Sequence, residues 1–213
     1  MPNLRLRRFL PRSLRRFADD ERGTSMIEFA MIMPALLATM AGTHAAGSLF
    51  STATQVSKTS AVVGDIISRT PATTGDSLQA VFDAAEIVIG PDLRSDLQLY
   101  AAGVQVVWDS GSNKNITEVL WVRDNRRLKG VMCADRPKIG QQLKHFDVPP
   151  QILQQTGQFF VYTRVRHEQA LPVAAEIIKL GDGGTYNHDY EHIYLTRDAL
   201  STDCPDCNKP PTC

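Results

Sequence analysis

An apolar run near the N-terminus, from Met26 to Phe50, limits how this chain can fold more than any other feature. As an α-helix this run would be about 37 Å long, enough to cross the ~30 Å hydrocarbon core of a bilayer. Residues 1–23, which come shortly before it, contain seven arginines and no lysine. Arginines on one side of an apolar helix predict that this side stays in the cytoplasm and that the rest of the chain is translocated. The expected divisions are a basic cytoplasmic leader (1–23), a transmembrane helix (24–50), a periplasmic α+β domain (51–200) and a Cys/Pro-rich tail (201–213).

The charge of the chain is unevenly distributed. The whole sequence has 23 basic and 23 acidic residues, and the leader has seven arginines and three acids, so the leader carries +4 and the rest −4. A nucleic-acid-binding protein usually shows a basic excess across its folded domain. We therefore expect membrane lipid as a partner and no nucleic acid.

Glu28 is unusual because it is a charged residue inside the apolar run. An acid in a membrane span is a functional hypothesis by default. If the chain is cut after Gly23, Thr24 becomes the first residue and Glu28 the fifth, followed by the aromatic Phe29. In this position Glu28 can pair with the positively charged amine that cleavage creates on a neighbouring subunit, because each of these charges is costly alone in an apolar setting.

This segment resembles the processing site of type IV prepilins, and more closely the TadE-like family of the tight-adherence (Tad/Flp, type IVb-like) pilus. The matching residues are Glu21, Arg22, Gly23, Thr24, Ile27, Glu28, Phe29, Ala30 and Pro34. The resemblance implies a minor pilin or pseudopilin, which is not an enzyme and needs no cofactor or metal. Its partners would be a prepilin peptidase, other pilins or pseudopilins and the inner-membrane assembly platform. The expected location is the bacterial inner membrane or an extracellular pilus used for surface attachment.

Four residues have expected roles in processing and assembly. Gly23 supplies the position before the cut, where the missing side chain lets the peptide backbone approach the peptidase. Thr24 supplies the new amine, Glu28 its pairing carboxylate and Phe29 an apolar neighbour.

Two simpler interpretations of the N-terminus remain open at this point. Arg7 and Arg8 suggest a twin-arginine secretory signal, with Thr43–Ala45 as a small-x-small cleavage site. The run could also be an uncleaved membrane anchor, in which Gly23 and Glu28 have no special role.

The helical pattern continues beyond the apolar run. Leu49, Ala53, Val56, Ser60, Val63 and Ile67 recur at spacings of three and four. This period predicts an amphipathic helix that ends near Arg69, because Pro71 disfavours helical geometry at Thr70. A helix from Thr24 to Arg69 would be about 69 Å long. The alternative is two helices with a break at Gly42 or Gly47.

The rest of the domain is predicted to contain one more helix and about four strands. The helix follows an N-cap at Asp76 or Ser77 and is closed by Gly90 and Pro91. Strands are expected at 97–108, with a bulge near 101–103, around 119–121, at 159–166 and at 191–196. An antiparallel sheet packed on helices is an α+β architecture.

The four cysteines are expected to form disulfides if the domain is translocated, because that compartment is oxidising. They are Cys133, Cys204, Cys207 and Cys213. We expect Cys133 to bond to one of the three tail cysteines, while a metal site or a redox pair at Cys204 and Cys207 is less well supported.

Two further clusters of polar residues are candidates for functional or solvent-exposed sites. His188 to His192 could bind a metal or do acid–base chemistry, which defines the alternative function: a membrane-anchored or secreted periplasmic metal-binding protein or enzyme. Its simpler interpretation is a polar loop that leads into an edge strand. The basic residues Arg123, Arg126, Arg127 and Lys129 are expected at a solvated hairpin end.

Overall fold

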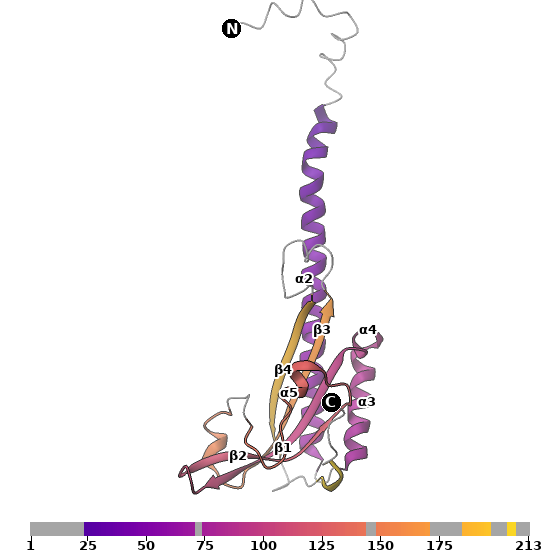
Figure 1. Ribbon diagram of the computed structural model, residues 1–213. Helices are drawn as coiled ribbons and strands as arrows, with labels where there is room; N and C mark the ends of the chain where they lie inside the picture. Colours follow the sequence, from indigo (N-terminus) through magenta and orange to yellow (C-terminus); the bar gives the residue numbers. More distant parts are fainter. Residues whose placement is uncertain (1–23, 71–73, 144–147, 171–184, 197–203, 208–213) are drawn as a thin grey trace, which may run out of the picture.

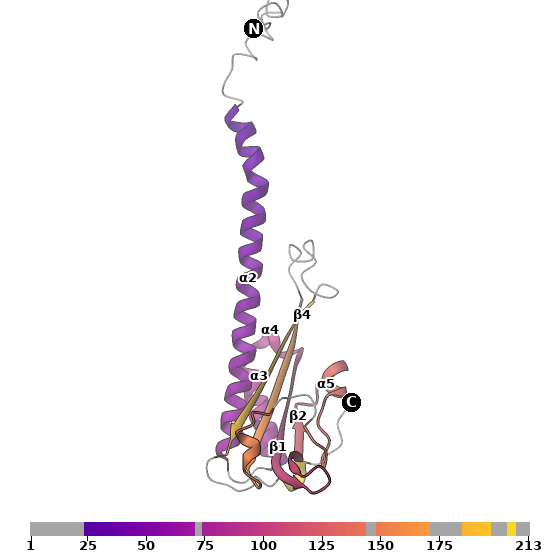
Figure 2. The same ribbon diagram turned by 90° about the vertical axis from the view of Figure 1, so that its left-hand side faces the viewer.

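Helix α2 (Thr24–Arg69) is continuous over 46 residues in this computed structural model. The structure describes residues 24–70, 74–143, 148–170, 185–196 and 204–207. The helix continues through Pro34 and does not break at Gly42 or Gly47. Its N-terminal half projects away from the sheet, and its C-terminal half lies along the sheet (Figures 1 and 2). The single long helix and its end at Arg69 are as predicted.

The C-terminal half of α2 packs through the predicted stripe. Val56, Ser60, Val63 and Ile67 are buried, and only the beginning of the stripe, toward Leu49, is partly exposed. Gly64 lies on the same face, where a Cβ atom would meet the ring of Tyr194. Small residues in the stripe therefore let the helix approach the sheet closely.

Helix α3 (Gly75–Ile89) begins two to three residues earlier than predicted. Its N-cap is Thr74, whose hydroxyl accepts a hydrogen bond from the Ser77 N–H at 3.2 Å, while the Ser77 hydroxyl accepts one from the Thr74 N–H at 2.9 Å. This reciprocal capping box satisfies two donors at once, which explains why the helix starts there. Gly90, with φ of 95°, ends the helix, and a short helix α4 (Pro91–Arg94) that the sequence analysis did not predict follows.

The sheet has four antiparallel strands in the order β2-β1-β3-β4. They are β1 (Leu97–Asp109), β2 (Lys114–Asp124), β3 (Phe159–Ala170) and β4 (Thr185–Leu195). The remaining elements are short: α5 (Gly130–Ala134), η3 (Ile152–Gln154) and η5 (Pro205–Cys207). The α+β architecture with a four-stranded antiparallel sheet is thus as predicted.

The bulge occurs near the predicted place, but its extra residue is on the other strand. Gly103 is opposite Trp121 and Val104 is opposite Val119, so Leu120 is the additional residue. The change in apolar phase along β1 has a different cause, because both faces of the sheet are covered. Leu99 belongs to the core that faces α2 and α3, whereas the next residue, Tyr100, belongs to a second core on the outer face.

Candidate functional site

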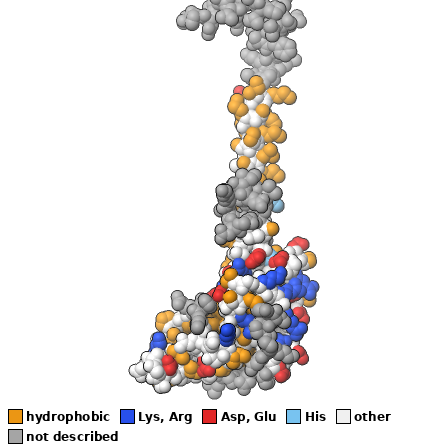
Figure 3. Space-filling view, viewed as in Figure 1, with side chains coloured by type: hydrophobic (Ala, Val, Ile, Leu, Met, Phe, Trp, Pro, Cys, Tyr) orange, Lys and Arg blue, Asp and Glu red, His pale blue; other side chains and the backbone are white. Residues whose placement is uncertain are grey.

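The projecting part of α2 exposes many apolar side chains, and they cover most of the face seen in Figure 3. All residues from 26 to 40 are exposed, and Met26 and Met40 retain 79% and 72% of their accessible surface. The helix is long and apolar enough to cross a membrane, with a mean hydropathy of 1.5 in its apolar window, none of which is buried. An exposed apolar surface of this extent marks a site that contacts lipid or other proteins.

Glu28 is the one Asp, Glu, Lys or Arg among residues 26–50. Its side chain is exposed, and it forms no ion pair or hydrogen bond with any other described residue. Phe29 beside it is 58% exposed. The helix begins at Thr24, directly after Gly23, which lies outside the described residues, and Thr24 precedes Glu28 by about 6 Å of helical rise. The carboxylate therefore lies near the start of an exposed apolar helix and has no partner in the described part of its own chain.

The polar cluster at 188–192 lies within β4. The prediction of a polar loop that leads into an edge strand at 191 is therefore wrong for residues 188–190, which are part of the strand. Alternation along the strand divides the cluster between the two faces of the sheet. His192 faces α2, where its Nδ1 lies 3.0 Å from the Ser60 hydroxyl oxygen. Asp189 and Glu191 face the other way, toward Arg164. The structure therefore does not bring the two histidines and the two acids together.

The contact between His192 and Ser60 is part of the packing between helix and sheet. Ser60 is fully buried, and its hydroxyl oxygen is also 3.4 Å from that of Thr163. Burial lowers the pKa of His192 and His188, which favours their neutral forms. The Nε2 atom of His188 lies 2.9 Å from the side-chain oxygen of Gln169. These contacts satisfy polar groups under α2 and leave no room for a substrate at Ser60.

Arg164 connects three carboxylates on the outer face of the sheet. It forms a bidentate pair with Asp189 at 2.8 and 2.9 Å, and it contacts Asp135 at 3.2 Å and Glu191 at 3.0 Å. The hydrogen bond to Asp189 raises the pKa of Arg164, and burial raises the pKa of Glu191. The guanidinium group neutralises one of three acids, so this cluster has a formal charge of −2 when all are ionised.

A cavity of about 220 Å³ lies next to this cluster, on the face of the sheet opposite His188 and His192. Its lining includes Tyr100, Tyr162 and residues 134–138 and 141–143. Arg136 is held by Asp124 at 3.0 Å, and burial raises the pKa of both tyrosines. The described residues contain no group of three or more His, Cys, Asp or Glu side chains that could hold a metal ion.

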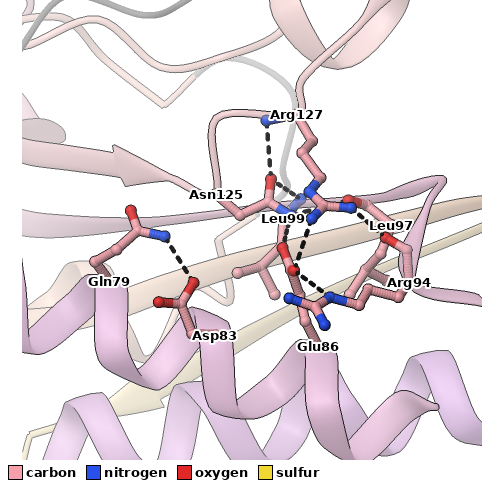
Figure 4. Close-up of polar contacts among 8 residues, drawn as sticks. All are labelled: Gln79, Asp83, Glu86, Arg94, Leu97, Leu99, Asn125 and Arg127. Atoms are coloured by element: carbon pink, nitrogen blue, oxygen red, sulfur yellow. Dashed lines mark hydrogen bonds and ion pairs between the residues drawn. The ribbon is translucent and has the colours of Figure 1, made fainter. Parts of the chain in front are cut away.

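A second buried network joins α3 and α4 to the strands (Figure 4). The Glu86 carboxylate accepts hydrogen bonds from Arg94 at 3.2 Å and from Asn125 at 3.1 Å, and it pairs with Arg127 at 3.1 Å. Asn125 also donates to the carbonyl oxygen of Leu97 at 2.9 Å. The sequence analysis missed this network, although Glu86 follows Phe82 by four residues on the buried face of α3.

The expectation that Arg123, Arg126, Arg127 and Lys129 are solvated is therefore wrong for Arg123, while Arg127 pairs with Glu86 and keeps 35% of its side chain exposed. Arg123 is 6% exposed because its position in β2 faces the core. Arg126 and Lys129 are exposed, as predicted.

Three disulfide-bonded cysteines lie in the described part of the chain. Cys204 and Cys207 are bonded to each other and buried in the core between the sheet and α3. Cys133 is also disulfide-bonded. Its partner is neither Cys204 nor Cys207, and Cys213 lies outside the described residues. Disulfide formation is as predicted, and the bond between Cys204 and Cys207 is buried packing that leaves no open pair for metal binding.

Comparison with protein-family models, with curated proteins and with solved structures finds no match to this chain.

Proposed function

We propose that this protein is a TadE-like minor pilin or pseudopilin of a tight-adherence pilus. The observation that carries the proposal is the form of α2, which is one helix of 46 residues, exposed and apolar in its first half and packed against a domain in its second. Such a helix can hold a subunit in a membrane and later pack against other subunits. The absence of any other Asp, Glu, Lys or Arg between residues 26 and 50 supports a specific role for Glu28.

In this proposal a prepilin peptidase removes residues 1–23 on the cytoplasmic side. The cut creates a positively charged amine at Thr24, and Glu28 pairs with the amine of a neighbouring subunit. Two charges that are costly alone in an apolar environment become acceptable as a pair. The protein acts as a peptidase substrate and an assembly partner, not as an enzyme, and its domain lies in the periplasm or on the pilus.

The test is the N-terminal sequence of the protein from membranes of its native host. We expect the mature chain to begin at Thr24. A chain that begins at Met1 would identify an uncleaved anchor, and one that begins near Ala46 would identify a secretory signal. Either result would refute the proposal.

A Gly23→Leu variant sharpens this test, because a bulky side chain before the cut keeps the backbone away from the peptidase. We expect this variant to reach the membrane but to retain its leader. The matched control is Gly47→Leu, which lies in α2 with no atom within 4 Å of its added Cβ and should be cut normally.

A further inference from the structure

Strand β4 forms an open edge of the sheet. It pairs with β3 over its whole length, from Thr185 opposite Ala170 to Leu195 opposite Phe160, without a register shift. Among the described residues, the main-chain groups of 186–195 form no hydrogen bond except those to β3. Every second residue from 186 to 195 therefore directs outward an N–H and a C=O that bond to no other described residue.

The opposite edge is covered by the chain itself. In β2, the Val119 N–H donates to the carbonyl oxygen of Gln141 at 3.0 Å, and the Val119 carbonyl accepts from the Gly140 N–H at 2.8 Å. Arg136 donates to the carbonyl oxygen of Val122 at 3.4 Å, and the Leu143 N–H donates to the Thr117 hydroxyl at 3.2 Å. Residues 136–143 thus cover part of the β2 edge, whereas no described residue covers the β4 edge.

Of the features that usually protect an edge strand, the sequence of β4 has only charged side chains, Asp189 and Glu191. Its 11 residues include no proline, glycine or lysine, and its pairing has no bulge. A long, regular edge of this kind tends to pair with other chains. We propose that β4 is a docking edge, completed in the assembled state by a fifth strand from a different subunit.

The orientation imposed by a shared membrane argues against a second copy of this chain. β4 lies along the C-terminal half of α2 (Figures 1 and 2), so two copies with parallel α2 helices have parallel β4 strands. An antiparallel β4–β4 pair is then excluded, and a parallel pair would place the like-charged Asp189 and Glu191 of the two copies side by side, which is destabilising. The β2 strand of a neighbouring copy runs in the required antiparallel direction, but its edge is occupied by residues 136–143. The occupant is therefore an extended segment of another protein.

The side chains of β4 indicate the chemistry of this segment. Asp189 and Glu191 share Arg164 with Asp135, and their side chains are 27% and 22% exposed. Side chains on an added strand would lie about 5 Å from them, measured between Cβ atoms. A lysine or arginine there balances the excess negative charge. On the α2 side, the exposed ring of Tyr186 offers an apolar contact. The partner strand is thus extended and basic at alternate positions.

Hydrogen exchange of the full-length protein tests this proposal. The protein is compared in native-host membranes and as a dilute monomer in detergent micelles. The outward amides of β4 are expected to exchange at least about tenfold more slowly in membranes, while those of β2 do not change. An Asp189→Lys/Glu191→Lys variant should lose the additional protection. The matched control, Asp109→Lys at the distant β1–β2 turn, should keep it.

Three results would overturn the proposal. The first is equal exchange of β4 in membranes and micelles. The second is protection that increases with protein concentration in micelles, which would identify a second copy as the occupant. The third is full protection of the charge-reversal variant, with its thermal unfolding unchanged. The docking proposal does not require cleavage after Gly23, and the N-terminal residue read from the same sample separates the two proposals.

Discussion

In the network around Glu86, removing the carboxylate and removing its two arginine partners should lower the free energy of unfolding by different amounts. The Glu86 carboxylate is 4% exposed, whereas its partners Arg94 and Arg127 are 51% and 35% exposed. After Glu86→Ala, both guanidinium groups can return to water. After Arg94→Ala/Arg127→Ala, the carboxylate stays buried with only Asn125 as a donor.

The exposed fractions of these three side chains determine how much unfolding free energy each variant should lose. Exposed cations lose little when they are rehydrated, so Glu86→Ala should cost about 2 kcal/mol of unfolding free energy, mainly from the Asn125 hydrogen bond and lost packing. The double arginine variant should cost about 3–5 kcal/mol, because it leaves a buried charge without a cation.

Urea unfolding of the full chain in detergent, followed by the fluorescence of the buried Trp121 with the disulfides intact, measures both values. The matched control is Asp65→Ala, which removes an exposed pair with Arg69 and should change the free energy by less than about 1 kcal/mol. The reasoning is refuted if Glu86→Ala costs as much as the double arginine variant, or if neither differs from the control.

Three further predictions concern packing, disulfides and pH. Gly64→Ala should destabilise the domain by about 1–3 kcal/mol, because its Cβ meets Tyr194, whereas Gly47→Ala should leave domain unfolding unchanged. Alkylation should detect no free thiol in the unfolded native protein before reduction and four afterwards, since the chain has four cysteines and each of the three in the described residues is disulfide-bonded; any thiol found before reduction would contradict this. Burial lowers the pKa of His188 and His192 below 6.5, so the unfolded state binds more protons as the pH falls through 6.5. The unfolding free energy should therefore be lower at pH about 5.5 than at about 7.5, and a His192→Gln variant in which this difference is unchanged would contradict the argument.

Elements with one apolar and one solvated face could be predicted from the sequence. The stripe from Leu49 to Ile67 has a helical period because the sheet covers only one side of α2. Strand β3 was also recognised, although both its faces are buried, because aromatic and β-branched residues fill it.

The start of β4 was missed because its two faces have similar polarity. Asp189 and Glu191 contact Arg164 on one face, while His188 and His192 contact polar groups on the other. With polar residues on both sides, the strand has no apolar alternation.

The Glu86 network could not be assembled from the sequence because its members are distant from one another in the chain. Asn125 is 39 residues from Glu86, and nothing local to either residue identifies the other. The proposed site at the start of α2, by contrast, rests on residues that are local in the sequence, because Thr24, Glu28 and Phe29 lie within two turns of one helix, and its role stays a prediction.

Glu28 provides a final prediction because membrane insertion and assembly should respond to it in opposite directions. A charged side chain costs about 2.5–3.5 kcal/mol at the centre of a span and less near its end. Glu28 has no partner among the described residues, so a single chain in the membrane bears whatever part of this cost applies at its depth. A Glu28→Ala monomer should therefore stay in the bilayer at least as firmly as the wild type. The variant lacks, however, the carboxylate that would pair with the Thr24 amine of a neighbour.

The expected outcome is a variant that is cut after Gly23, resists extraction from membranes by alkaline carbonate, and fails to enter sedimentable assemblies. Glu28→Asp, which keeps the charge on a shorter side chain, is the matched control and should assemble in part. If Glu28→Ala assembles as well as the wild type, the carboxylate has no role in recruitment. If the variant is lost from the membrane instead, Glu28 acts in insertion, and the proposed pairing is wrong.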